Sequence, residues 1–432
     1  MGAFLNVISV VFWGLVMLSL IIVVHEGGHF TAAKLFGLRV KEFMIGLPGP
    51  NIGFKLKGTK FGVTPFLLGG YALIAGMQPA PKGGGQTLVR SLTELAESGS
   101  LDTAAIQKRE KLLGYDLEGD LDQLFDWGTI ERKKRKDGLY LYELPATDGY
   151  QRGQSRSYPD PQGFLAAERQ QTFAGAPWYK RFIILLGGPA FNLIFAIIVF
   201  TLAMTIVGGS VATTTVASTQ DGSPAASAGV APGDQLMAIN GQTVDSWDTF
   251  STLVLAQQPG DTVTLSVLHD GQPTDYQVTL ADNEGNAFMG ISPTANKVPI
   301  SLPSAFTSSV GFIGYVAVAI SQLFNPATFT TVISQSTSVV GISFVARDAA
   351  DSGFLPFIML AAALSISIGL MNLLPLPPLD GGKIVLETIQ RLARREIPVR
   401  VISTISIVVM VALGLLFIVL TRQDIQNFIF GG

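Results

Sequence analysis

Long apolar runs dominate the hydrophobic pattern of this chain of 432 residues. Four runs carry no charged side chain and, as helices, are long enough to cross a hydrocarbon core of ~30 Å; they are residues 4–24, 182–208, 354–379 and 401–421. A fifth uncharged stretch, 302–324, contains Ser, Thr and Gly throughout. We interpret it as a helix packed on or partly into the outer leaflet, with a fifth span as the alternative. The pattern predicts a mainly α-helical multi-pass membrane protein with four core transmembrane helices.

The segment that follows the first apolar run has a strand pattern. Residues 46–76 alternate around glycine breakers, which predicts a membrane-associated β-hairpin region. Two roles fit strands in this place. An edge strand that includes Gly69, Gly70 and Tyr71 could pair with an extended substrate, or the region could be a plain hairpin at the membrane surface.

Residues 78–176 are polar and charged, with loop clusters at 79–85 and 149–161. Helices expected at 104–114 and 121–131, followed by a strand at 139–144, resemble a small winged-helix unit. The basic run 132–136 could contact nucleic acid or anionic lipid. We favour a solvated turn near the membrane, and we expect no nucleic-acid partner.

Residues 211–295 form a separate mixed α/β domain in our interpretation. The stretch 222–244 resembles the centre of a PDZ domain of the bacterial protease type, with a small alanine-rich helix, a strand at 236–239 and a hairpin turn at Asn240-Gly241. Further strands are expected at 263–268 and 276–280. Gly290 lies where such domains carry a carboxylate-binding loop, so we include it among the candidate substrate-binding residues.

The distribution of charge orients the four expected spans. Only 14% of the residues are charged, against ~25% in ordinary soluble domains. The loop 30–181 holds 21 of the 29 Lys and Arg residues, whereas 209–353 holds two. Because basic loops stay on the cytoplasmic side, we expect 209–353 and both termini outside. No Lys or Arg precedes Lys34, so we expect the first run to be a retained helix rather than a signal peptide.

The candidate chemistry lies at the end of the first apolar run, in the sequence His25-Glu26-Gly27-Gly28-His29. Ionisable groups at membrane depth are costly and usually functional. Residues i and i+4 share a helix face, so His25 and His29 can bind one metal ion, and Glu26 can then accept a proton from water beside it. A structural role for the histidines is the alternative. The chain contains no cysteine, which excludes disulfides and thiolate ligands.

A catalytic zinc usually has three protein ligands and an open position, so a third ligand is needed. The third long run ends in a segment rich in proline and glycine that contains Asp380. Such a segment breaks a helix and leaves the carboxylate free to turn inward. The alternative is that Asp380 is simply the first cytoplasmic residue after a span.

These motifs together resemble the site-2 protease family of intramembrane zinc proteases, within it the bacterial RseP-like branch. Its HExxH motif is matched by His25, Glu26 and His29, and its LDG motif by residues 379–381. A family asparagine thought to help stabilise the oxyanion is matched by Asn372, and the segment 187–192 resembles the family's glycine-asparagine segment. Lys383 replaces a histidine that often follows the LDG motif, and compact family members lack the insertion at 78–176.

The resemblance implies a zinc-dependent endopeptidase that cleaves transmembrane segments of membrane proteins. It implies a Zn²⁺ cofactor on His25, His29 and Asp380, with Glu26 and Asn372 as catalytic residues. It further implies a bacterial cytoplasmic membrane location, lipid bilayer contact, a PDZ domain on the extracytoplasmic side that gates or docks substrates, and an upstream site-1 protease that trims them.

Two other classes of protein compete with this interpretation. A membrane PDZ scaffold with a structural metal site would normally need a fourth protein ligand, and none is evident. A transporter would show repeats between its halves, and none is apparent.

The expected domains are the first transmembrane helix (1–32), the β-hairpin region (33–77), the cytoplasmic insertion (78–176), the second transmembrane helix (177–210), the PDZ domain (211–295), an outer interfacial segment (296–353), the third transmembrane helix (354–382), and the cytoplasmic link with the fourth transmembrane helix (383–432).

Overall fold

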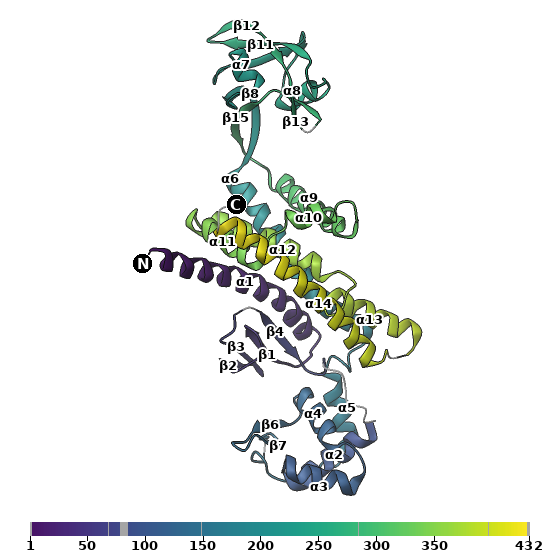
Figure 1. Ribbon diagram of the computed structural model, residues 1–432. Helices are drawn as coiled ribbons and strands as arrows, with labels where there is room; N and C mark the ends of the chain where they lie inside the picture. Colours follow the sequence, from purple (N-terminus) through teal and green to yellow (C-terminus); the bar gives the residue numbers. More distant parts are fainter. Residues whose placement is uncertain are drawn as a thin grey trace. The chain divides into compact units, whose positions relative to one another are not determined.

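The computed structural model describes residues 2–67, 69–77, 85–147, 149–283, 285–395 and 397–429 (Figure 1). It divides into two compact units, of which the first joins Met1–Phe200 to Thr307–Gly432 and the second is Thr201–Phe306. The boundary expected at residue 78, and most of the loop cluster expected at 79–85, lie outside the described residues.

Long apolar helices account for the hydrophobic runs. The four expected spans correspond to α1 (Gly2–Leu35), α6 (Trp178–Val207), α12 (Phe354–Asn372) and α14 (Val399–Asp424). The stretch at 302–324 forms α9 (Leu302–Ser321) and a short 3-10 helix, η1 (Gln322–Phe324). By length and composition the described residues include five candidate spans, one of them Leu302–Phe324. A mostly helical protein with several membrane-length helices is confirmed, and the number of core spans stays a prediction.

The segment after η1 contains two helices, α10 (Phe329–Ser334) and α11 (Val339–Asp351). α11 packs on α1 and α12, where Ala346 is buried with Met17 and Phe357. A Cβ added to Gly14 would lie 2.1 Å from Ser343 Oγ, so small residues let α1 and α11 approach closely. The expectation of an interfacial segment at 296–353 did not include a helix packed against the first span.

The end of α14 is tied to the start of α11. A carboxylate oxygen of Asp424 accepts hydrogen bonds from the backbone N–H groups of Ser338 (2.6 Å) and Gly341 (3.1 Å). These N–H groups are among those that a helix start leaves without a partner, so Asp424 caps α11 from another helix. The chain then continues into a short π-helix, η2 (Ile425–Ile429).

A four-stranded sheet follows α1, with strand order β2-β3-β1-β4. Its strands are β1 (Val40–Ile45), β2 (Ile52–Leu56), β3 (Thr59–Val63) and β4 (Gly70–Ile74). β2 and β3 form the expected hairpin, whereas β1 pairs in parallel with β3 and antiparallel with β4. β4 is therefore an edge strand, and it lies along α1: a Cβ on Gly70 would lie 2.5 Å from Ile22 Cγ2.

Within its described residues, 85–147 and 149–176, the insertion combines four helices with a three-stranded sheet of order β5-β7-β6. Its elements are α2 (Gly85–Ser98), β5 (Ser100–Asp102), α3 (Thr103–Leu113), α4 (Leu117–Trp127), β6 (Glu131–Lys134), β7 (Tyr140–Glu143) and α5 (Pro161–Gln170). The helix expected at 121–131 begins earlier, after the N-cap residue Asp116, and it ends earlier because Gly128 stops α4 in a left-handed conformation (φ 74°). Buried leucines of α2 and α4 pack with Tyr142 in its core.

Most of the basic run 132–136 is paired within the insertion. Arg132 contacts Asp122 at 2.6 Å. Two further ion pairs join Lys133 to Glu143 at 3.1 Å and Arg135 to Asp102 at 3.0 Å. The run begins within β6 (Glu131–Lys134), and the solvated turn near the membrane stays a prediction.

The insertion is docked on the four-stranded sheet by ion pairs. Arg39 contacts Glu168 at 2.8 Å, and Lys41 contacts Asp126 at 3.6 Å. The Asp126 carboxylate also accepts a hydrogen bond of 2.9 Å from the N–H of Gly76, just beyond β4. Contacts at both strands β1 and β4 therefore fix how the insertion meets the sheet.

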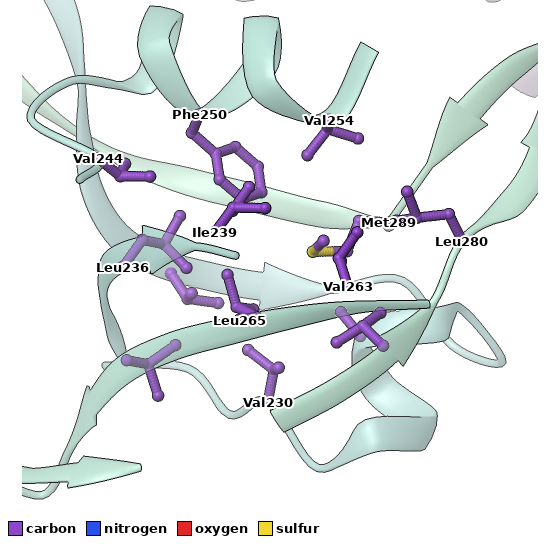
Figure 2. Close-up of a cluster of buried hydrophobic side chains, with 14 of the residues drawn as sticks. Val230, Leu236, Ile239, Val244, Phe250, Val254, Val263, Leu265, Leu280 and Met289 are labelled. Atoms are coloured by element: carbon purple, nitrogen blue, oxygen red, sulfur yellow. The ribbon is translucent and has the colours of Figure 1, made fainter. Parts of the chain in front are cut away.

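The second unit contains a β-rich domain with two helices. Its elements are β8 (Gly209–Thr219), α7 (Pro224–Ala228), β9 (Gln235–Ile239), β10 (Gln242–Thr243), α8 (Trp247–Leu255), β11 (Thr262–His269), β12 (Gln272–Thr279), β13 (Ala281–Asn283), β14 (Asn286–Phe288) and β15 (Ile291–Val298). The main sheet has the order β12-β11-β9-β8-β15. Phe250 and Val254 project from α8 toward the sheet and pack near Ile239 and Met289 (Figure 2). The hairpin turn expected at Asn240-Gly241 joins β9 to β10.

Candidate metal centre

The last turns of α1 carry three of the candidate residues. His25 and His29 are 9% and 7% exposed, and their rings meet edge to face with centroids 5.0 Å apart. Both rings turn toward α6, which passes very close to α1: a Cβ on Gly28 would lie 2.0 Å from the carbonyl oxygen of Gly187. The helical spacing i, i+4 therefore places both imidazoles on the face where α1 meets α6.

Asp380 reaches the histidines from the other end of the chain. After α12 ends at Asn372, a turn leads to α13 (Asp380–Ala393), whose first residue is Asp380. Its Oδ2 atom lies 3.1 Å from Nε2 of His25 and 3.1 Å from Nε2 of His29. The next residue, Gly381, packs so tightly against the turn that an added Cβ would lie 2.2 Å from the carbonyl oxygen of Leu373. The folded turn thus carries the carboxylate to the imidazoles.

The chemistry and spacing of these three groups fit a zinc ion. Their ligand atoms all lie within 4.8 Å of one another, and the three residues are buried. Tetrahedral zinc takes His nitrogen and Asp oxygen ligands at ~2.0–2.1 Å, so its donor atoms lie about 3.3 Å apart, close to the observed separations. A Cβ on Gly188 would lie 2.4 Å from His29 Nε2 and 2.8 Å from His25 Nε2, so the glycine keeps this space clear. Three protein ligands would leave a fourth position for water or substrate.

Each proposed ligand has a second partner on its far side. His29 Nδ1 lies 2.7 Å from the backbone carbonyl oxygen of Ile184, so it donates there and leaves Nε2 free to bind a metal. His25 Nδ1 lies 3.3 Å from Nδ2 of Asn192. The other carboxylate oxygen of Asp380 lies 3.3 Å from Nζ of Lys383. Such outer contacts orient metal ligands and tune their basicity.

Glu26 is held against the edge strand. Its Oε2 atom accepts a hydrogen bond of 2.9 Å from the N–H of Ala72 in β4. A Cβ on Gly70 would lie 3.6 Å from Glu26 Cγ, so the carboxylate side chain and the strand are in contact. This arrangement brings the Glu26 carboxylate and an edge strand together beside the turns of α1 that carry the histidines.

The remaining candidate residues are not part of the three-residue cluster. The side-chain amide of Asn372 donates to the carbonyl of Ile368 in its own helix, at 3.0 Å. Gly69 directly precedes β4, and Gly70 is its first residue. The Tyr71 hydroxyl donates to Glu42 at 2.7 Å, and burial together with this hydrogen bond raises the pKa of Tyr71 to about 12.

Gly290 belongs to the second unit. It occupies the turn between β14 and β15 with φ +79°, a conformation that favours glycine. Its carbonyl oxygen accepts a hydrogen bond from the N–H of Gln220 at 2.9 Å.

Three groups around the cluster of His25, His29 and Asp380 were assigned no role from the sequence. The carbonyl of Ile184 leaves no signal in a sequence, because any residue supplies one. Gly188 and Asn192 were noted only as part of the segment 187–192. An asparagine inside a membrane-length helix is itself a usable signal, since buried polar groups there usually have a partner.

Comparison with known proteins identifies the family. The sequence model of Peptidase family M50 matches residues 13–417. The chain belongs to Peptidase family M50. A Lactococcus lactis protein is 28% identical over 427 residues, which are 95% of this chain and 97% of that protein. The zinc metalloprotease RasP of Geobacillus kaustophilus is 25% identical over 429 residues, 96% of this chain and 97% of its own length. RasP of Shouchella clausii is also 25% identical, over 438 residues, 95% of this chain and 97% of its own.

Among solved structures, the PDZ domain of the SdrC-like protein of Listeria innocua is 27% identical, with a TM-score of 0.18, and covers 19% of this chain and 92% of its own. The M50 match confirms the resemblance to site-2 proteases. The chain is a zinc metalloprotease of the site-2 type, and the family implies zinc and membrane-protein substrates.

Proposed function

We propose that this M50 peptidase cleaves peptide bonds within membrane-spanning segments, with His25, His29 and Asp380 as zinc ligands. The observation that carries the proposal is the meeting of these three side chains at the end of a membrane-length helix, where Asp380 Oδ2 lies 3.1 Å from Nε2 of each histidine. The carboxylate comes from a segment some 350 positions away, so a chance cluster is a poor explanation. Zinc, when bound, supplies Lewis-acid activation of water and of the scissile carbonyl.

Glu26 is the general base in this proposal. Its carboxylate follows directly after His25 on α1, and the bond from the Ala72 N–H holds one oxygen while the other stays available to accept a proton. Asn372 is the proposed oxyanion helper. Its amide must exchange the bond to Ile368 for one to the substrate, which a side-chain rotation achieves.

Substrate binding is assigned to Gly69 and to β4, which includes Gly70 and Tyr71. A transmembrane helix hides its carbonyls in its own hydrogen bonds, so it must be unwound before hydrolysis. An edge strand can hold an extended chain by backbone hydrogen bonds. The Ala72 N–H is already bound to Glu26, so the substrate would pair with other groups along β4 or compete for this one.

The wider assignment follows the charge pattern. We propose four core spans (α1, α6, α12 and α14) in a bacterial cytoplasmic membrane, with the insertion inside and the β-rich domain outside. In this proposal the β-rich domain is a PDZ domain whose turn at Gly290 takes part in docking or gating substrates already trimmed by an upstream protease. The two basic residues in 209–353, against 21 in 30–181, support this orientation.

The test compares three variants of the full-length protein reconstituted with a reporter substrate that has one transmembrane segment. Glu26→Gln should keep its zinc and lose cleavage, whereas Asp380→Ala should lose both. Asp351→Ala is the matched control, because this exposed acid at the end of α11 should affect neither. Zinc is measured by elemental analysis. Undiminished cleavage by a zinc-loaded Glu26→Gln protein would refute the assignment of the base, whereas zinc binding without cleavage by the wild type would favour a scaffold with a structural metal.

A further inference from the structure

Asn192 is a fully buried asparagine in the middle of a membrane-length helix. It is 0% exposed on α6, and its Nδ2 atom lies 3.3 Å from Nδ1 of His25. Its Oδ1 atom is buried and has no hydrogen-bond partner among the residues that the structure describes. A polar side chain in this place is costly, so it calls for a function.

Metal binding requires one particular tautomer of His25. If Nε2 binds the metal through its lone pair, a neutral imidazole carries its proton on Nδ1 and needs an acceptor there. His29 has such an acceptor in the carbonyl of Ile184, at 2.7 Å. The neighbour of His25 Nδ1 is the side-chain amide of Asn192, which contains both a donor and an acceptor.

The side-chain amide of Asn192 can serve either tautomer of His25. Its NH₂ group faces Nδ1, which fits the tautomer whose proton is on Nε2, the atom 3.1 Å from Asp380. A half-turn of the amide would present Oδ1 to Nδ1 instead. Because no partner in the described chain holds Oδ1, this rotation breaks no other hydrogen bond.

The backbone of Asn192 is fixed by α12, so the motion is confined to the amide. Ser365 Oγ donates to the backbone carbonyl of Asn192 at 3.2 Å. A Cβ on Gly369 would lie 3.1 Å from Asn192 Cβ, which shows how closely α12 packs there.

We propose that Asn192 is a positioning residue for the metal ligand His25. Its amide donates to Nδ1 of one tautomer and, after a half-turn, accepts from Nδ1–H of the other, the tautomer whose Nε2 lone pair can bind zinc. This inference rests on the ligand set of the proposed function, and it adds a residue outside the three ligands on which zinc affinity depends.

The test measures the Kd for Zn²⁺ by competition with a chelator of known affinity, on full-length protein in detergent. Asn192→Leu has a similar volume but no acceptor, so we expect its Kd to rise by about 10- to 100-fold, the usual effect of removing an outer partner of a metal ligand. Asn192→Asp keeps an acceptor and has no donor. It should restore the Kd to the wild-type value or below it.

Ser365→Ala is the matched control, since it removes a contact to the Asn192 backbone and leaves the amide in place. Its Kd should match that of the wild type. An unchanged Kd in Asn192→Leu would overturn the inference. An equal increase of the Kd in the Leu and Asp variants would also overturn it, because the acceptor would then make no difference to zinc affinity. His25→Ala separates the two proposals: if it also keeps full affinity, the metal site itself is wrong.

Discussion

Substituting Gly188 by alanine should remove zinc from the protein although no ligand residue is replaced. Gly188 lies on α6 opposite the two imidazoles, where an added Cβ would lie 2.4 Å from His29 Nε2 and 2.8 Å from His25 Nε2. Ordinary contacts begin at 3.4 Å. The His29 ring must therefore recede by about 1 Å, whereas metal–ligand distances tolerate only ~0.2 Å.

The loss of one ligand bond sets the expected magnitude. Structural zinc sites with four ligands bind with ~10–16 kcal/mol, or about 3 kcal/mol per ligand. At ~1.4 kcal/mol for each factor of ten, this corresponds to a Kd increase on the order of 100-fold. Alanine also has a higher helix propensity than glycine by ~1 kcal/mol, so unfolding of α6 is not the expected cause of zinc loss.

The assay is zinc retention after dialysis against a chelator, with helical content followed by circular dichroism. Gly27→Ala is the matched control, because it lies in the same motif but its added Cβ would meet no atom within 4 Å. Gly27→Ala should retain zinc, and Gly188→Ala should not. Retention of zinc by a folded Gly188→Ala protein would show that the metal does not lie between these imidazoles.

Two further predictions concern the β-rich domain and the topology. His269 Nδ1 lies 2.6 Å from Asp234 Oδ1, and this hydrogen bond raises the pKa of His269. The pair therefore stabilises the domain fully below the unfolded-state pKa of ~6.5. This stabilisation is lost as the pH rises through the pKa of His269 in the folded protein. His269→Gln should thus speed hydrogen exchange in β11 at about pH 5.5 but not at about pH 9, and equal effects at both would contradict this. The chain contains no cysteine, so Ser227→Cys should react with an impermeant thiol reagent in intact cells and Ser155→Cys only after lysis; reversed labelling would overturn the proposed orientation.

The sequence predicts local features of this molecule better than its long-range contacts. The spacing of His25 and His29 is a property of one helix, so it follows from the sequence directly. The approach of Asp380 depends on how α12 ends and α13 begins, and the proline- and glycine-rich segment indicates a break without giving its direction. The resemblance to a known family identified Asp380 as the third metal ligand.

Elements whose formation depends on distant partners were missed or misplaced. β1 was not predicted, because its alternation is weak and its strand pairs with β3 and β4 across intervening loops. The packing of α11 on α1 depends on a match between Gly14 and Ser343, more than 300 positions apart. The ends of α4 were misplaced, although Gly128, which terminates the helix, is visible in the sequence.

The crossing of α1 and α6 limits how this segment can evolve. The helices touch through main-chain atoms, since a Cβ on Gly28 would lie 2.0 Å from Gly187 O and one on Gly187 would lie 2.7 Å from Gly28 O. No side chain separates them, so no compensating change in a neighbouring side chain can restore the fit once either glycine is replaced. Gly27 faces open space and is free of this constraint. Gly27 can therefore be replaced readily during evolution, whereas the main chain of α6 restricts the next position, Gly28, to glycine.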